Sequence, residues 1–313
     1  MNAVKIKLLN LILLIDFIIY IFTNLIIYKS NLSTAYSILI LCTRDIIIFL
    51  FSIVIYIYFC NSKVSSMVLF AKINNKIIKN SIIIGIAFYF IANGANLLFT
   101  RIFKFTMKSR IYLNNVYDLY NFGFSFFIYI FVYTVFAEMF FRGILNDAFK
   151  NFSYKFRIIV PSFLFSIFFF GLSQWFYGFV LGMLLMLFFD KVKNIIPLII
   201  VSLTINILNY FLRLFGKKFL SASIPRIISS TRGDIFIEVL LPIIIILVGL
   251  FVCSIFQDKI NSKTKSKSTE SKNLSNVTQL EFKNDTKDII DKYFVLFIIS
   301  SLVMTLVSYI FLG

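Results

Sequence analysis

The sequence predicts an all-α protein, a polytopic transmembrane helix bundle with about nine spans, and three observations lead to this fold class. First, 60% of the 313 residues are hydrophobic and only 14% are charged, whereas soluble domains are about 45–50% apolar and about 25% charged. Second, the mean hydropathy is +0.92. Third, the chain divides into about nine apolar runs, most of them near the roughly 20 residues that a membrane-spanning helix needs.

Residues 1–121 are predicted to form N-terminal transmembrane helices. The first apolar run is over 20 residues long, carries Asp16 and Asn24 and lacks a small-x-small cleavage site. It is therefore interpreted as a retained span rather than a cleaved signal peptide. The predicted spans of this region are Ile6–Tyr28, Tyr36–Phe59 and Ser81–Thr100.

Residues 122–215 are predicted to form a core of four spans. The first of these is long enough to tilt or to project beyond the bilayer, and the third is short enough to be tilted or partly re-entrant. The four apolar runs are Phe122–Phe149, Ile158–Trp175, Phe176–Phe189 and Ile195–Phe215.

The C-terminal third contains the one long hydrophilic block. Residues 216–256 are predicted to contain one transmembrane helix, at Ile235–Phe256. Residues 257–292 are rich in Ser, Lys, Asn and Thr without a long apolar run, a composition typical of a flexible loop. Residues 293–313 are predicted to form a C-terminal transmembrane helix, Tyr293–Leu312.

The distribution of Lys and Arg predicts the orientation in the membrane. With the N-terminus in the cytoplasm, the inside segments hold 19 Lys and Arg residues and the outside segments hold 10. Cytoplasmic loops carry such an excess, so we predict a multi-pass cell-membrane protein with a cytoplasmic N-terminus. The formal net charge of +17 is scattered over helix ends, which favours anionic membrane lipids as partners and not nucleic acid.

The chain contains no histidine, and this absence excludes several kinds of site. Histidine is the usual general base near neutral pH and the commonest neutral metal ligand. Serine triads with histidine, Cys-His dyads, two-histidine zinc helices and proximal haem ligation are therefore excluded. Cys42, Cys60 and Cys253 lie far apart without metal-ligand spacing, so we predict no disulfide framework, no bound metal and no cofactor.

Two groups of charged residues within predicted spans stand out, since each charge at bilayer depth costs about 2.5–3.5 kcal/mol. Arg44 and Asp45 stand near the start of the second span and are interpreted as structural, satisfied by snorkelling or by a neighbouring helix. Glu138 and Arg142 are four residues apart, which places a carboxylate and a guanidinium on one helix face. Without other observations, this spacing favours an intrahelical tie over a catalytic pair.

Further polar residues can join the Glu138 pair. Ser202 and Asn206 are four residues apart on the seventh span, and Gln174 lies between the two groups in the sequence. Three helices could thus converge on a buried polar cluster, whose hydrogen bonds would contribute about 0.6 kcal/mol each to the bundle. Gly178 and Gly182 form a small-xxx-small pair that would let another membrane helix dock closely.

The order of these motifs resembles the core of the CAAX protease and bacteriocin-processing family, also called the CPBP or Abi family. The motifs are Ala-Glu-x-x-x-Arg-Gly, Phe-Gly-Leu-Ser-Gln, Gly-x-x-x-Gly and Pro-x-x-x-x-Ser-x-x-x-Asn, within residues 122–212. Family members are multi-span intramembrane proteases with the motifs Glu-Glu-x-x-x-Arg, Phe-x-x-x-His and His-x-x-x-Asn. The resemblance implies a CPBP/Abi-like core over about a third of the chain.

The resemblance also implies a role for each motif position. The family's water-activating glutamate falls on Ala137, its second glutamate on Glu138, its arginine on Arg142, its two histidines on Gln174 and Ser202, and its asparagine on Asn206. The candidate site therefore retains Glu138, Arg142 and Asn206, whereas three positions closest to the chemistry are substituted.

These substitutions predict a catalytically degenerate member. Alanine has no proton acceptor, glutamine cannot titrate and is a poor zinc ligand, and Ser202 has no neighbouring base to make it a nucleophile. Losing an oxyanion donor costs about 10²–10³ in rate, and acid–base groups contribute about 10²–10⁴ more.

The sequence allows three functions. The preferred one is a membrane protein without peptidase activity, acting in binding, regulation or bacteriocin immunity, with a membrane or cell-envelope protein or a small peptide as partner. The alternative is an active intramembrane endopeptidase that uses Glu138 as a substitute base, with Gln174 and Asn206 orienting water. A transporter or channel is disfavoured because the chain has no evident repeats and few charges beyond the cluster.

Overall fold

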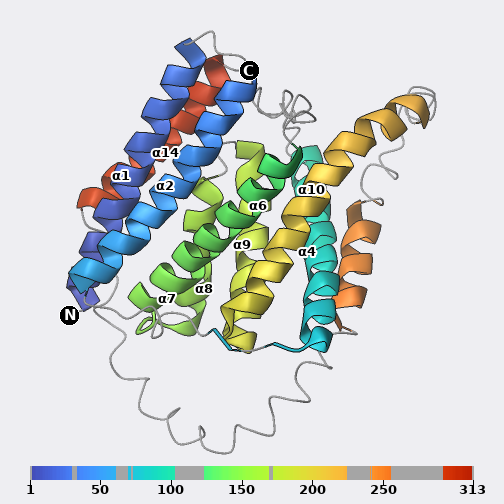
Figure 1. Cartoon of the computed structure of the whole chain (residues 1–313), viewed down its shortest axis with the longest axis horizontal. Helices are drawn as coiled ribbons and strands as arrows, with labels where there is room; N and C mark the ends of the chain where they lie inside the picture. Colours follow the sequence, from blue (N-terminus) through green and yellow to red (C-terminus); the bar gives the residue numbers. More distant parts are fainter. Residues whose placement is uncertain are drawn as a thin grey trace, which may run out of the picture.

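A computed structural model describes residues 2–29, 34–60, 70–71, 73–102, 123–168, 172–223, 240, 242–254 and 292–311. Within these ranges all regular secondary structure is helical (Figure 1), which confirms the predicted all-α class. Four of the described helices are long and apolar enough to cross a membrane: Val4–Thr23, Thr43–Cys60, Asn75–Thr100 and Gln174–Val192. Shorter apolar helices cover Ile195–Asn209, Pro242–Ser254 and Lys292–Leu302. This set of helices indicates a multi-pass membrane protein.

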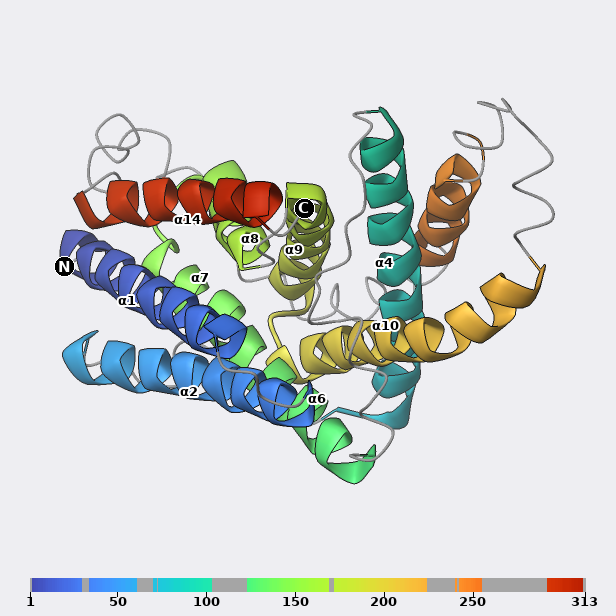
Figure 2. The same ribbon diagram turned by 90° about the horizontal axis from the view of Figure 1, so that it is seen from above.

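The two ends of the chain pack together. α1 (Asn2–Lys29) lies against α2 (Thr34–Cys60), and α14 (Lys292–Phe311) lies along the other side of α1 (Figure 2). Phe17 of α1 meets Phe297 of α14 edge to face, with 5.5 Å between the ring centroids, and both side chains are fully buried. The C-terminal helix therefore completes a three-helix unit with the N-terminal pair.

The core helices follow in the order α6 (Gly123–Glu138), η2 (Met139–Ile144), α7 (Leu145–Ala148), α8 (Tyr154–Ile167), α9 (Leu172–Val192) and α10 (Ile195–Ser223). α6, η2 and α7 form one helical run that corresponds to the predicted long fourth span. α10 packs against α6 on one side and against α4 (Asn75–Ile102) on the other, while α9 packs against both α8 and α4. α6 and α10 are therefore neighbours, as a shared polar cluster requires.

The predicted boundary between the fifth and sixth spans was wrong. The predicted fifth span ends at Trp175 and the predicted sixth span is short, but Trp175 lies in the first turn of α9, which has 21 residues. α8 is the short helix, with 14 residues. Hydropathy could not find this break because the chain stays apolar across it, so no charged loop marks the end of α8.

Gly182 is covered by another helix of the same chain. A Cβ atom there would lie 3.0 Å from the Ser162 Cα atom and 3.1 Å from a ring carbon of Phe165, both on α8. At Gly182 the predicted close helix approach is therefore made within the bundle, and it leaves no open face there for a partner helix.

The helix Pro242–Ser254 docks on α4 through glycine on each side (Figure 1). A Cβ atom at Gly249 would lie 2.6 Å from Ile91 Cγ1 and 2.9 Å from the Ala87 carbonyl oxygen. A Cβ atom at Gly94 would lie 2.8 Å from Ile246 Cγ1. Missing side chains at these two positions allow the backbones to approach closely, as in other membrane helix pairs.

We expect Gly249→Leu to lower the free energy of unfolding by about 1–3 kcal/mol, because overpacking forces the two backbones apart. Val248→Leu is the matched control, since Val248 is 50% exposed on the adjacent position of the same helix. Thermal unfolding of the detergent-solubilised protein measures both. Equal stability of the two variants would show that the close contact at Gly249 contributes nothing to the free energy of unfolding.

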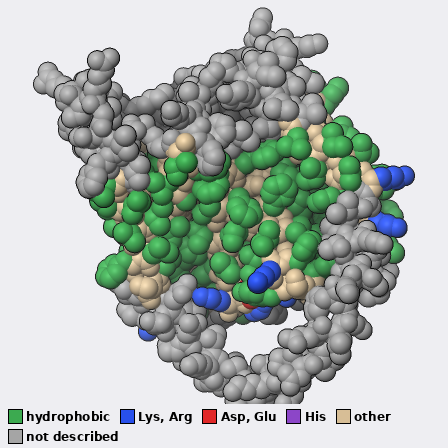
Figure 3. Space-filling model, turned by 180° about the vertical axis from the view of Figure 1, so that it is seen from behind, with side chains coloured by type: hydrophobic (Ala, Val, Ile, Leu, Met, Phe, Trp, Pro, Cys, Tyr) green, Lys and Arg blue, Asp and Glu red, His purple; other side chains and the backbone are tan. Residues whose placement is uncertain are grey.

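The outer surface of the bundle is an apolar belt with cations at its margins. Figure 3 shows a broad hydrophobic face, with Lys and Arg side chains at its edges. Large exposed side chains on this surface include Ile47, Val54, Leu247 and Phe251. In a membrane protein such side chains face lipid, so they need no protein partner.

Candidate functional site

A π-helical turn shapes the candidate site. α6 ends at Glu138, and the following six residues, Met139–Ile144, form the π helix η2. The Leu145 amide donates to the Phe140 carbonyl five residues back instead of four. Such turns insert one residue into an α-helix and are frequent at functional sites. Arg142 and Gly143 lie inside this turn, so it sets the direction of the Arg142 side chain relative to Glu138.

Glu138 and Arg142 form a buried ion pair. Arg142 Nη1 lies 3.2 Å from Glu138 Oε2, and the two side chains are only 2% and 4% exposed. The contact lacks hydrogen-bond geometry, so its attraction is that of opposite charges in a low-dielectric interior. The pairing predicted from the i, i+4 spacing is confirmed as a contact, although the intervening turn is π-helical.

Arg142 also lies over an aromatic ring. Its guanidinium carbon is 4.6 Å from the centroid of Phe165 on α8 and 5.8 Å from that of Phe141. Phe141 itself meets Phe165 edge to face, with the centroids 4.9 Å apart. A guanidinium over a ring face gains cation–π attraction, so α8 helps to hold the buried charge of Arg142.

Ser202 joins the ion pair from α10. Its hydroxyl donates a hydrogen bond of 2.6 Å to Glu138 Oε1, and its residue is 5% exposed. The Glu138 carboxylate therefore has one oxygen on Arg142 and the other on Ser202. Through this hydrogen bond, between residues 64 positions apart in the sequence, α10 contacts the Glu138–Arg142 pair.

Asn206 reaches the same helix one turn away. Its side-chain amide donates to Thr134 Oγ1 over 2.9 Å, and the Thr134 hydroxyl donates to the Ile130 carbonyl over 2.6 Å. Thr134 precedes Glu138 by four residues, just as Ser202 precedes Asn206 by four. α6 and α10 are thus joined by two hydrogen bonds one helical turn apart, which we call the α6–α10 seam: Thr134, Glu138, Arg142, Ser202 and Asn206.

Two of the predicted motif positions, Ala137 and Gln174, form no side-chain contact with the α6–α10 seam among the described hydrogen bonds and ion pairs. Ala137 is 4% exposed beside Glu138, and it offers no polar side-chain atom. Gln174 is half-buried on α9, and within the described residues no hydrogen bond connects it to the α6–α10 seam. α9 meets α10 through a different pair, since the Asn209 amide donates to Tyr177 Oη over 3.1 Å.

Sequence reasoning missed Thr134 and Phe165. Thr134 could have been found as the residue four before Glu138, on the same helix face. Phe165 has no such signal, because only packing of α8 brings its ring to Arg142. The segment Phe170–Gly171 of the second motif lies outside the described residues.

The donor set at the two histidine positions does not fit a zinc ion. Zinc in proteins is bound by thiolate, imidazole or carboxylate, whereas these positions hold an amide at Gln174 and a hydroxyl at Ser202. The Ser202 hydroxyl is also engaged with Glu138. Among the residues that the structure describes, no three His, Cys, Asp or Glu side chains gather to hold a metal.

A second polar cluster links the N-terminal helices to the core. Asp147 of α7 accepts hydrogen bonds at Oδ2 from Lys5 Nζ at 2.7 Å and from Tyr56 Oη at 3.0 Å. Its other oxygen accepts from Lys150 Nζ at 2.9 Å. One buried carboxylate thus ties α1, α2 and α7 together, and we call this group the Asp147 cluster.

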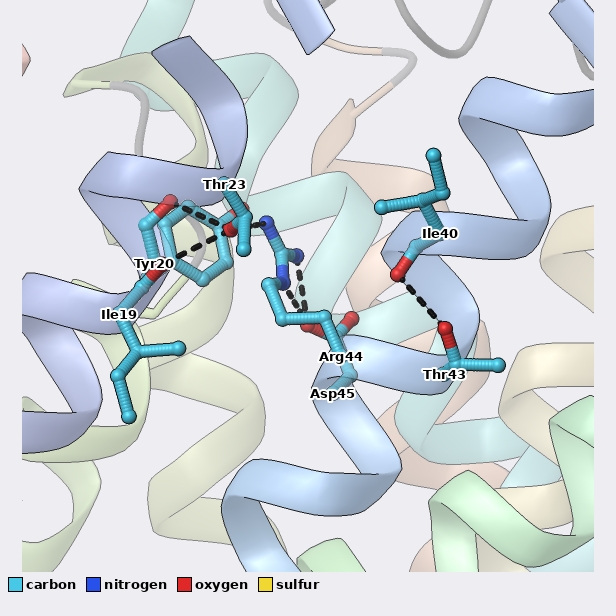
Figure 4. A network of polar contacts seen from close by, with 7 residues as sticks. All are labelled: Ile19, Tyr20, Thr23, Ile40, Thr43, Arg44 and Asp45. Atoms are coloured by element: carbon cyan, nitrogen blue, oxygen red, sulfur yellow. Dashed lines mark hydrogen bonds and ion pairs between the residues drawn. The ribbon is translucent and has the colours of Figure 1, made fainter. Parts of the chain in front are cut away.

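The Arg44–Asp45 group is satisfied within the N-terminal pair of helices (Figure 4). Arg44 Nε donates to Asp45 Oδ1 over 2.7 Å, and Nη1 lies 3.3 Å from Thr23 Oγ1 on α1. The guanidinium carbon is 3.7 Å from the centroid of the Tyr20 ring. The expectation of a neighbouring helix as partner is therefore met by α1, and the group lies apart from the α6–α10 seam.

Residues 120–208 match a protein family described as type II CAAX prenyl endopeptidase, Rce1-like. The match confirms the family resemblance predicted from the motif order, and it covers less than a third of the chain. It contains every residue of the α6–α10 seam. No curated protein and no solved structure matches the chain.

Proposed function

We propose that this membrane protein, whose core is similar to Rce1-like prenyl endopeptidases, has kept their scaffold without their peptidase activity. It acts in this proposal as a binding or regulatory protein of the membrane, with bacteriocin immunity as one such role. The single observation that carries the proposal is the state of Glu138, the carboxyl group retained from the family's glutamate pair. It is 3% exposed; one oxygen accepts a hydrogen bond from Ser202, and the other lies 3.2 Å from Arg142 Nη1 as an ion contact without hydrogen-bond geometry.

A general base must reach the water that it activates, and the deep burial of Glu138 supports a role other than that of a base. A base needs a heavy-atom distance of about 2.6–3.2 Å to the water that gives up its proton, so water must reach the carboxylate. The carboxylate instead neutralises Arg142 and accepts from Ser202, which is the arrangement of a structural tie. Ala137, at the position of the family's base, has no acceptor to replace it.

The proposal includes nine spans with a cytoplasmic N-terminus. Its support is that, among the described residues, most exposed cations lie at one end of the bundle, where α1, α4 and α8 begin and where α2 and α9 end (Figure 1). Cations retained on the cytoplasmic side favour anionic lipid headgroups there. The exposed side chains are Lys7, Lys76, Lys79, Lys150, Lys155, Lys191 and Lys193.

A combined cleavage and binding assay tests the proposal on the full-length protein in detergent. We expect prenylated peptides and leader peptides to remain intact after incubation, by mass spectrometry. Binding is read from Trp175, the one tryptophan of the chain, which follows Gln174 on α9. A peptide that binds should change the Trp175 fluorescence while its own chain stays whole.

The alternative function, an active endopeptidase with Glu138 as substitute base, predicts the opposite result. It requires cleavage by the wild type that Glu138→Gln abolishes and that Asp45→Asn leaves intact. Asp45→Asn is the matched acid-to-amide change outside the family-like core. Cleavage with this pattern would refute the non-catalytic proposal.

A further inference from the structure

A carboxyl group lies at the middle of α1, and no ion pair joins it to any Lys or Arg that the structure describes. Asp16 is near the centre of the candidate span Val4–Thr23, and it is 1% exposed. Its Oδ2 atom lies 2.7 Å from Ser52 Oγ on α2, and its Oδ1 atom is buried without a hydrogen-bond partner. Neither the α6–α10 seam nor the Asp147 cluster includes this residue.

Two oxygen atoms lie within hydrogen-bond distance of the single hydroxyl of Ser52. Ser52 Oγ is 2.8 Å from the Ile48 carbonyl oxygen and 2.7 Å from Asp16 Oδ2. A hydroxyl carries one hydrogen, and a carbonyl oxygen can only accept. If Ser52 donates to Ile48, the contact to Asp16 is a hydrogen bond only when Asp16 carries the second proton. A neutral Asp16 satisfies both contacts at once.

The charged groups on the surrounding helices are engaged elsewhere. α1 packs against α2, α14 and α7. On α2, Arg44 pairs with Asp45, and Tyr56 donates to the Asp147 carboxylate of α7. Lys5 of α1 pairs with the same carboxylate, and Lys292 of α14 lies over the Tyr293 ring. Within the described residues, no Lys or Arg forms an ion pair with Asp16.

An ionised carboxylate in this place would be expensive. Burial of an unpaired charge costs several kcal/mol even after relaxation of the protein, whereas a carboxylic acid that is hydrogen-bonded costs far less. Ionisable side chains at bilayer depth are therefore expected to have a cation as partner or to be neutral.

We propose that Asp16 is a proton-binding site inside the membrane: a neutral carboxylic acid whose O–H donates to Ser52 Oγ and joins α1 to α2. The aspartate is ionised when it meets water, so closing the α1–α2 pair takes up one proton. The closed pair is then favoured at low pH, and its stability falls as the pH rises. This inference is independent of the proposed function.

Three acid-to-amide variants of the full-length protein in detergent test the proposal. An amide has the shape of a neutral acid but needs no proton, so Asp16→Asn should have a Tm at or above that of the wild type at pH 7.5. This advantage should grow from pH 5.5 to pH 8.5. Asp147→Asn and Glu138→Gln are the matched controls, and both should lower the Tm because their carboxylates pair with cations.

Chemical labelling locates the proton directly. A hydrophobic carbodiimide reacts with a protonated carboxyl group, whose O–H adds across the C=N bond, and the acyl group then moves to nitrogen. The adduct adds the whole mass of the reagent, and we expect it on the Asp16 peptide and not in Asp16→Asn. A lower Tm for Asp16→Asn at pH 7.5, or labelling of Glu138 or Asp147 in place of Asp16, would overturn the proposal.

Discussion

Replacing Arg142 with alanine should lower the free energy of unfolding by about 3–5 kcal/mol. The change leaves the Glu138 carboxylate buried without its cation, and removing one partner of a buried pair has a cost of this size. It also removes the guanidinium from the Phe165 ring. Chemical or thermal unfolding of the protein in detergent, followed by Trp175 fluorescence, measures the loss.

Two further variants separate charge from packing at this pair. Arg142→Met combined with Glu138→Gln removes both charges and should be more stable than Arg142→Ala, because replacing a buried pair by neutral groups of similar volume is often close to neutral. Arg157→Ala is the control at the bundle end, where the side chain is 21% exposed and pairs with Asp190. It should cost about 1 kcal/mol or less. An Arg142→Ala loss no larger than that would contradict the assignment of a buried structural tie.

Asp147→Ala should loosen the N-terminal helices from the core, again with a loss of about 3–5 kcal/mol. The carboxylate is the common acceptor of Lys5 and Tyr56, and the Lys5 side chain is only 9% exposed. Removing it leaves a buried ammonium group without this anion. Hydrogen exchange should show α1 and α2 opening more often, while α9 and α10 keep their protection.

Two milder substitutions measure how much individual contacts of the Asp147 cluster contribute to stability. Tyr56→Phe removes one hydrogen bond and should cost about 0.5–1.5 kcal/mol. Lys150→Ala removes an ion pair whose lysine side chain is 51% exposed, so its effect should stay below about 1 kcal/mol. If all three variants lost the same stability, the cluster would not act through the buried Lys5 and Tyr56 contacts.

Much of the candidate site was predictable because its information is local. Glu138 and Arg142 meet because they are four residues apart, and Ser202 and Asn206 share a face for the same reason. The motif order then predicted the family that residues 120–208 match. The role of these residues stays a prediction, which the cleavage assay and the Arg142 variants test.

The errors and omissions concern features without a local signal. The break between α8 and α9 falls in a continuous apolar stretch, so hydropathy placed it at Trp175 instead of before Leu172. The π turn at Arg142 and the ring of Phe165 beneath its guanidinium depend on how α6 and α8 pack. No spacing rule connects residues on separate helices.

Composition and spacing by themselves determined that this chain is helical and lies in a membrane. They also determined that its core resembles a CAAX-type protease and that no site in it can use histidine. Only the tertiary structure decided which polar groups meet. In the folded chain Ser202 forms a hydrogen bond with Glu138, and Asn206 forms one with Thr134. Lys5 and Tyr56 both donate hydrogen bonds to Asp147. The physical reason is that hydropathy selects helices one at a time, whereas a buried polar atom must find its partner on whichever helix packs beside it.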